Sequence, residues 1–233
     1  KVKTVLVTCV TSLGTVLLPR LSYYIQQKKK EEFQRMVTKA FQFVLVVSIP
    51  MTVYFIIYVK ESILFLAGES FLPATAAMII LMPTLILIGL SNITGIQILT
   101  PLGRESNVVC SVAAGAVLDF VLNLVLIPKF GSTGAAFSTT MAELLVLIVQ
   151  CIYLRKQLWE MVRHVQVWKI VVAIMFASIV GVIFQNKIIM NVFGTLCVSA
   201  ILFFGVYGVI LLVLKEDFVS DTVESLFKKI WRK

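Results

Sequence analysis

Residues 106–154 read SNVVCSVAAGAVLDFVLNLVLIPKFGSTGAAFSTTMAELLVLIVQCIYL, two long apolar runs that a short polar segment separates. Each run, 106–128 and 134–154, is long enough to cross a hydrocarbon core about 30 Å thick as an α-helix, which rises about 1.5 Å per residue. Neither run shows the polar–apolar alternation of a membrane β-strand. The sequence therefore predicts two membrane-spanning helices joined by a tight loop.

Five further apolar segments extend this pattern over most of the chain. Hydrophobic residues make up 59% of the sequence and the mean hydropathy is +0.98, well above the values of soluble domains. The expected fold class is all-α, a polytopic membrane helix bundle of about seven transmembrane helices. The predicted spans are 2–19, 40–59, 76–100, 106–128, 134–154, 168–184 and 190–214.

Three parts are predicted along the chain: a five-span transmembrane bundle at 1–154, two trailing transmembrane helices at 155–214, and a cytoplasmic amphipathic tail at 215–233. Within the tail, apolar residues recur at helical spacing among basic residues over 218–233. This pattern predicts a helix that lies on the inner leaflet.

Two prolines fall inside predicted spans. Pro50 and Pro83 are expected to interrupt the second and third spans, because proline removes a backbone hydrogen bond and kinks a helix. Such a bend can act as a hinge or be static, and the sequence leaves both readings open.

The basic residues concentrate on alternate loops. Of 21 Lys and Arg residues, 16 follow the first, third, fifth and seventh spans. Because cytoplasmic loops carry an excess of Lys and Arg, these loops and the C-terminus are predicted to be cytoplasmic. The net charge of +9 then describes a membrane surface and gives no support for nucleic-acid binding. Lys1 would lie outside with no leading signal before it, so we expect the chain to be the C-terminal part of a larger protein.

The basic run Lys28-Lys29-Lys30, followed by Glu31-Glu32, lies in one of these cytoplasmic loops. Its simplest interpretation is a solvated, lipid-facing stretch. The functional alternative is attraction of an anionic headgroup or pyrophosphate at the inner leaflet.

Residues for covalent or metal chemistry are sparse. The predicted external loops, 60–75, 129–133 and 185–189, contain no cluster of catalytic side chains, and His164 is the single histidine. We therefore expect no catalytic residue, no metal, no cofactor and no enzymatic activity. The four cysteines are interpreted as buried apolar side chains without a disulfide framework: Cys9, Cys110, Cys151 and Cys197.

Asp119 and Glu143 are the only acidic residues placed well inside predicted spans. A charged carboxylate near a helix centre costs roughly 2.5–3.5 kcal/mol, so each should face the bundle interior, a partner or a water-filled cavity. The carboxylates share helix faces with other polar or small residues: Gly115 and Asn123 with Asp119, and Thr139 and Gln150 with Glu143. Interhelical hydrogen bonding, worth about 0.6 kcal/mol per contact, and a substrate or ion path are both compatible with this pattern.

Four motifs occur in order within residues 14–154. They are Leu18-Pro19-Arg20-Leu21-Ser22; Gly68-Glu69-Ser70-Phe71; Ile96-Gln97-Ile98-Leu99 followed by Pro101-Leu102-Gly103-Arg104-Glu105; and Ile127-Pro128-Lys129-Phe130-Gly131 followed by Gly134-Ala135-Ala136. As a set they resemble bacterial polysaccharide flippases of the Wzx type. Those proteins belong to the multidrug/oligosaccharidyl-lipid/polysaccharide exporter superfamily, which also contains the lipid II flippases and the MATE drug exporters.

The resemblance implies a two-lobed transporter of 12–14 helices that works by alternating access. This chain would supply most of the C-terminal lobe, and its missing N-terminal lobe would be a required partner. The implied activity is export of undecaprenyl-diphosphate-linked oligosaccharide repeat units across the bacterial cell membrane. Membrane lipids, a polysaccharide polymerase and glycosyltransferases would be further partners. The substrate-cavity candidates are Arg20, Asn92, Asp119, Asn123 and Glu143.

Three alternative functions remain. A MATE-like cation or drug antiporter would use the acidic residues as its cation site. A non-transporting membrane scaffold in glycan assembly would be compatible with a partial chain. A membrane polymerase or ligase is disfavoured, because the short external loops offer no catalytic surface.

Overall fold

The computed structural model describes residues 2–162, 165–187, 191–216, 218–220 and 224. Helices dominate these residues, and no β-strand occurs among them. The protein is an all-α polytopic membrane protein, as predicted. The chain divides into two compact units, Lys1–Val165 and Gln166–Lys233.

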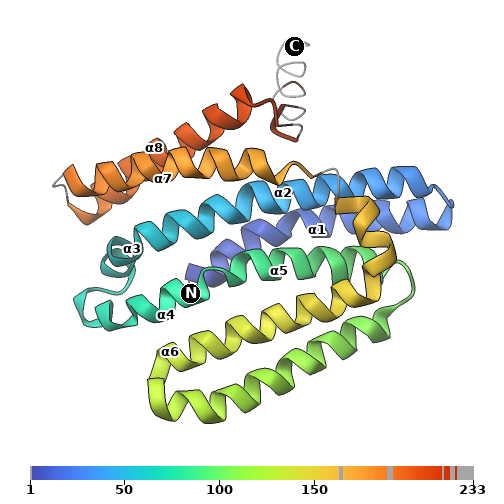
Figure 1. The fold of residues 1–233 in the computed structure, drawn as a ribbon, viewed down its shortest axis with the longest axis horizontal. Helices are drawn as coiled ribbons and strands as arrows, with labels where there is room; N and C mark the ends of the chain where they lie inside the picture. The colour runs from blue at the N-terminus through green and yellow to red at the C-terminus, as the bar shows by residue number, and fades with distance from the viewer. Residues whose placement is uncertain (1, 163–164, 188–190, 217, 221–223, 225–233) are drawn as a thin grey trace. The chain divides into compact units, whose positions relative to one another are not determined.

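Unit 1 holds most of the helices (Figure 1). In chain order they are α1 (Val2–Gln26), α2 (Lys30–Ile57), α3 (Val59–Leu66), the 3₁₀-helix η1 (Glu69–Ala74), α4 (Thr75–Leu81), α5 (Thr84–Asn92), the π-helix η2 (Ile93–Leu99) and α6 (Glu105–Val162). A buried apolar core lies where α1, α2, α5 and η2 meet, with Leu21, Val37 and Ile93 fully enclosed. In lipid such a core is held by van der Waals packing, because lipid tails are as apolar as the side chains.

Two predicted spans share the long helix α6. Its apolar part, Glu105–Arg155, has 51 residues. That length corresponds to about 75 Å of helix, more than twice a hydrocarbon core. The helix folds back at Gly131, whose φ of 55° is costly for any residue with a side chain. The first arm, 105–130, and the second arm, 132–162, therefore account for the predicted spans 106–128 and 134–154.

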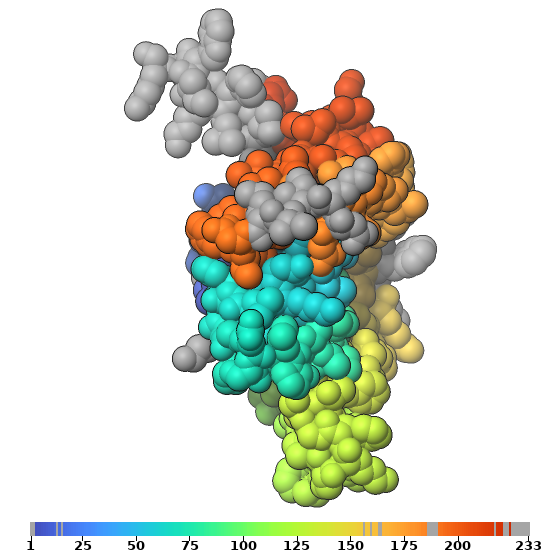
Figure 2. All heavy atoms as spheres, turned by 90° about the vertical axis from the view of Figure 1, so that its left-hand side faces the viewer, coloured from blue at the N-terminus to red at the C-terminus, as the bar shows by residue number. Residues whose placement is uncertain are grey.

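The turn between the arms is tightly packed. A side chain at Gly134 would collide with the backbone carbonyl of Leu126, so a glycine is required where the second arm begins. Figure 2 shows this turn (yellow-green) extending beyond the α3–α4 segment (cyan).

The third predicted span is a bent pair of helices. The segments Glu69–Leu81 and Thr84–Leu99 meet at 41°. The predicted interruption at Pro83 is thus confirmed. Hydroxyl groups satisfy the carbonyls around the break: Thr140 donates to Ile80, Thr84 to Leu81, and Thr52 to Met82. Such side-chain donors allow a broken helix to persist in a membrane.

Other predictions about local structure are wrong. Helix α2 runs from Lys30 to Ile57 through Pro50, so no break occurs there; packing against neighbouring helices allows a membrane helix to retain proline. The segment predicted as an external loop, 60–75, forms most of α3 and all of η1. The cysteines are free, but Cys9, Cys110 and Cys197 are exposed and Cys151 is half-buried, because lipid rather than protein is available to cover these helix faces.

Unit 2 contains α7 (Val167–Lys187) and α8 (Val192–Val213), which pack against each other. Small residues such as Ala173 and Ala177 are fully buried and permit close approach. The ammonium group of Lys169 donates to the carbonyl of Lys215 at 2.7 Å. His164 and most of the tail helix predicted at 218–233 lie outside the described residues.

Candidate functional site

A cavity of about 420 Å³ lies among α5, η2 and the two arms of α6. Three of the predicted cavity candidates, Asn92, Asp119 and Glu143, line this one space. The structure thus brings together residues from α5 and from both arms. A concave, largely apolar space with a few convergent polar groups is typical of a ligand-binding site.

The shape of the cavity depends on a change of helix type. Helix α5 passes at Ile93 into η2, where the amide of Thr100 donates to the carbonyl of Gly95 five residues earlier. A π-helical turn of this kind is wider than an α-helical turn and often marks a functional site. At the opposite wall, Gly115 brings the two arms together, because a side chain there would collide with Val146.

One end of the cavity is fixed by a buried hydrogen-bond chain. The hydroxyl of Thr94 donates to Oε1 of Gln150 at 2.5 Å, and Nε2 of Gln150 donates to Oγ of Ser111 at 3.1 Å. All three side chains are almost completely buried. Because these hydrogen bonds join η2 to both arms of α6, they fix the positions of the cavity walls relative to one another.

The carboxylates of Asp119 and Glu143 take no part in these hydrogen bonds. Asp119 on the first arm and Glu143 on the second arm line the same cavity. Oδ1 of Asp119 is buried and has no hydrogen-bond partner among the described residues. A buried acceptor without a partner is costly, so this oxygen can gain from a donor that enters the cavity.

A second pair of amides adjoins the cavity. Nε2 of Gln97 donates to Oδ1 of Asn92 at 3.3 Å, and Oε1 of Gln97 is buried without a partner in the described structure. Helix α1 reaches this pair through Gly14, where an added Cβ would lie 2.7 Å from Oδ1 of Asn92. The polar region around Asn92 therefore continues toward α1.

The remaining two candidates lie elsewhere. Arg20 is exposed, six residues before the end of α1 at Gln26, and does not line the cavity. Asn123 lies one helical turn beyond Asp119 on the first arm, outside the lining, and its buried Oδ1 has no described partner.

Sequence reasoning missed several polar residues of this region. Thr94, Gln97 and Ser111 were not among the candidates, although Gln97 is an isolated amide in an apolar run.

The polar groups of the cavity are carboxylates, amides and hydroxyls. Among the described residues, no group of three or more His, Cys, Asp or Glu side chains could hold a metal ion. Carboxylate and amide groups in a partly polar space can instead accept hydrogen bonds from hydroxyl groups or attract a cation.

Comparison with known proteins adds a family to this geometry. The family model described as "Lipid II flippase MurJ" matches residues 6–204. A relative from Methanocaldococcus jannaschii, described as an uncharacterized membrane protein, is 28% identical over 221 residues. The match covers 94% of this chain and 43% of the relative, so the chain spans less than half of that protein's length. No solved structure matches the chain.

Proposed function

We propose that this chain, which belongs to the lipid II flippase MurJ family, forms one lobe of a flippase for a polyprenyl-diphosphate-linked saccharide. The family match and the earlier motif resemblance agree on a lipid-linked flippase, but the match does not select the Wzx branch. Peptidoglycan lipid II is accordingly the first candidate substrate. The oligosaccharide repeat unit implied by the motifs is the second.

The cavity beside Asp119 and Glu143 carries this proposal. A saccharide headgroup presents many hydroxyl donors, and the cavity presents acceptors, one of which is buried without a described partner. Two carboxylates would repel a diphosphate. We therefore assign the sugar to this cavity and expect basic groups elsewhere in the complete transporter to hold the diphosphate.

The transport cycle follows from the insolubility of a polar headgroup in hydrocarbon. The two lobes would enclose the headgroup, while the prenyl tail stays in lipid and the lobes rock to open on alternate sides. The π-helix η2 lines the cavity, and the break at Pro83 lies before Ile88 on the same span, so the third span has a discontinuous backbone. Discontinuous helices of this kind form binding sites in many transporters. No covalent step is required, and the basic loops and C-terminus would face the cytoplasm.

A transport assay on the whole protein that contains this chain tests the proposal. Asp119→Asn and Glu143→Gln should each lower the flipping rate of lipid II in proteoliposomes by at least about tenfold, because a hydrogen bond to a charged group contributes about 1.5–3 kcal/mol. Glu69→Gln, at an exposed carboxylate of η1, is the matched control and should flip lipid II normally. Unchanged rates in the two cavity variants, with normal insertion, would reject the proposal and favour a scaffold.

A MATE-like cation antiporter is the second candidate function. The observation that favours it is the buried oxygen of Asp119, which has no described partner and lies in a cavity that Glu143 also lines. Proteoliposomes that accumulate a fluorescent organic cation but do not flip lipid II would decide for the antiporter.

A further inference from the structure

A second pocket, of about 330 Å³, lies at the turn between α1 and α2, where α6 also contributes to its wall. Its rim carries three consecutive basic residues, Lys28, Lys29 and Lys30. Its apolar wall includes Phe33, Leu102 and Met161. No carboxylate is among the described lining residues, and the pocket combines positive charge with an apolar surface.

The turn holds these lysines at the ends of two membrane-spanning helices. The amide of Lys29 donates to the carbonyl of Tyr24 at 2.9 Å, which closes α1 and starts the return of the chain. Lys28 adopts a φ of 55°, a conformation in which glycine would be less strained. Helix α2 begins at Lys30, and no side chain caps its N-terminus. The partial positive charge of this helix end therefore adds to the charge of the lysines.

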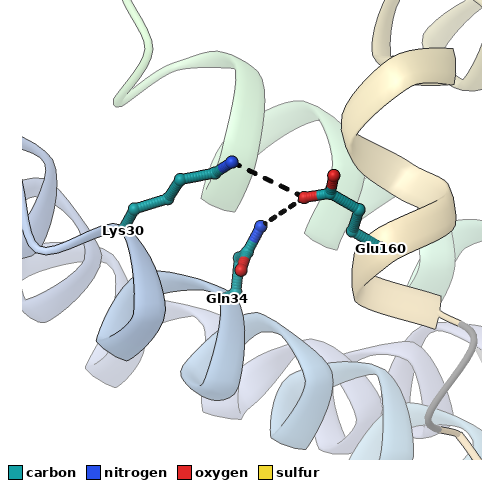
Figure 3. Close-up of polar contacts among 3 residues, drawn as sticks. All are labelled: Lys30, Gln34 and Glu160. Carbon is teal, nitrogen blue, oxygen red and sulfur yellow. Dashed lines mark hydrogen bonds and ion pairs between the residues drawn. The ribbon is translucent and has the colours of Figure 1, made fainter.

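Acidic groups near the pocket neutralise only part of the positive charge of the three lysines. Oε2 of Glu160 lies 3.6 Å from Nζ of Lys30 and accepts a hydrogen bond from Nε2 of Gln34 at 2.8 Å (Figure 3). Glu31 and Glu32 lie in the first turn of α2 and are exposed. Lys28 and Lys29 form no ion pair with any described residue.

A buried amide in the pocket also lacks a partner. Gln157 lines the pocket, and its Oε1 is buried without a hydrogen bond to any described group. A hydroxyl or amide donor from a bound headgroup would satisfy this oxygen. The pocket thus offers charge for an anion, an acceptor for a neutral polar group, and an apolar wall.

We propose that this pocket binds the headgroup of an anionic glycerophospholipid. Lys28 and Lys29 hold the phosphate, Gln157 accepts from a headgroup hydroxyl, and the wall formed by Phe33, Leu102 and Met161 contacts the glycerol and upper acyl chain. Helix ends place the lysines at the level of the lipid phosphates, where basic residues attract anionic lipids. Glu160 competes with the lipid phosphate for Lys30, because its carboxylate already pairs with the ammonium group of that lysine.

Lipid binding to the purified full chain in detergent tests this site, with phosphatidylglycerol and phosphatidylcholine as probes in native mass spectrometry. Phosphatidylglycerol should bind at least about tenfold more tightly than phosphatidylcholine. The double variant Lys28→Gln/Lys29→Gln should lose about tenfold in affinity for phosphatidylglycerol and little for phosphatidylcholine. The double variant Lys60→Gln/Lys129→Gln removes the same charge at exposed residues outside the pocket and should change neither affinity by more than about twofold.

A variant that binds phosphatidylglycerol more tightly provides a further test, because a misfolded protein would lose affinity rather than gain it. Glu160→Gln should tighten phosphatidylglycerol binding roughly two- to threefold, since the charge of Lys30 is then free for the headgroup. An equal loss in both double lysine variants would show general charge attraction and overturn the site. Inorganic phosphate or pyrophosphate that displaces phosphatidylglycerol at equal concentration would also overturn it, because the site would then recognise free phosphate.

These measurements use binding alone and contain no transported substrate. The lipid site can therefore stand if the flippase proposal fails, and it can fail while transport is confirmed.

Discussion

The cavity beside α6 and the pocket at the α1–α2 turn both contain polar side chains, but the two regions hold them differently. In the cavity, Gln150 is almost completely buried and bonded to two other helical segments. At the turn, Lys30 is 76% exposed and reaches Glu160 from a distance of 3.6 Å. Inside a membrane a polar group must be positioned by protein partners, whereas at the interface water and lipid headgroups can solvate it.

The largest effect is expected at the turn between the two arms of α6. Gly134→Ala should destabilise the fold by about 2–3 kcal/mol, because its Cβ would meet the carbonyl of Leu126. Unfolding by sodium dodecyl sulfate in mixed micelles measures the change. Gly205→Ala is the control, since nothing lies within 4 Å of its Cβ. Equal stabilities of the two variants would show that the turn of α6 relaxes easily.

The next prediction compares the loss of stability caused by substitutions at two glutamines. Gln150→Leu should cost about 1–3 kcal/mol, because it removes the two buried hydrogen bonds to Thr94 and Ser111, which keep only carbonyl acceptors in their own helical turns. Gln157→Leu should cost less, since its Oε1 has no described partner to lose. The same unfolding experiment ranks them, and the reverse order would mean that the turn pocket is the more highly structured region.

Added salt should weaken the interactions of the charged turn pocket but not the uncharged contacts beside the cavity, because salt screens charges. Raising sodium chloride from about 0.05 M to 0.5 M shortens the screening length to a few ångströms and should weaken phosphatidylglycerol binding at the turn several-fold. The stability loss caused by Gln150→Leu should not change with salt, because the Thr94–Gln150–Ser111 contacts are buried and uncharged. Salt-independent lipid binding would contradict an exposed ionic site.

The smallest effect is expected at the ion pair in Figure 3. Lys30→Gln should change stability by less than about 0.5 kcal/mol, because exposed ion pairs contribute little. Chemical denaturation of Lys30→Gln beside Glu160→Gln provides the measurement. A loss above about 2 kcal/mol in either variant would mean that the pair is structural.

Apolar length and composition were sufficient to predict the helical membrane fold, and the motif Ile127-Pro128-Lys129-Phe130-Gly131 marked the tight turn of α6. Periodicity placed Asp119 and Glu143 on polar faces, but it could not show that those faces meet, because helix rotation is set by packing between segments. Small residues such as Gly115 determine that packing.

Other structural features cannot be recognised from the local amino-acid sequence. The π-helix η2 is a local rearrangement of backbone hydrogen bonds, and its sequence, ITGIQIL, is compatible with an ordinary helix. Arg20 remains a candidate by motif alone, since it does not line the cavity and α1 continues beyond it to Gln26. Pro50 and Pro83 differ in outcome although each lies in an apolar run, since neighbouring helices decide whether a helix breaks at proline.

The three threonine hydroxyls around Pro83 have a mechanical consequence. Thr52 ties α2 to one end of the break, and Thr140 ties the second arm of α6 to the other. Straightening the bend would pull the carbonyls of Met82 and Ile80 away from both donors at once. A change in the bend would therefore break both hydrogen bonds unless α2 and the second arm of α6 moved together with α4.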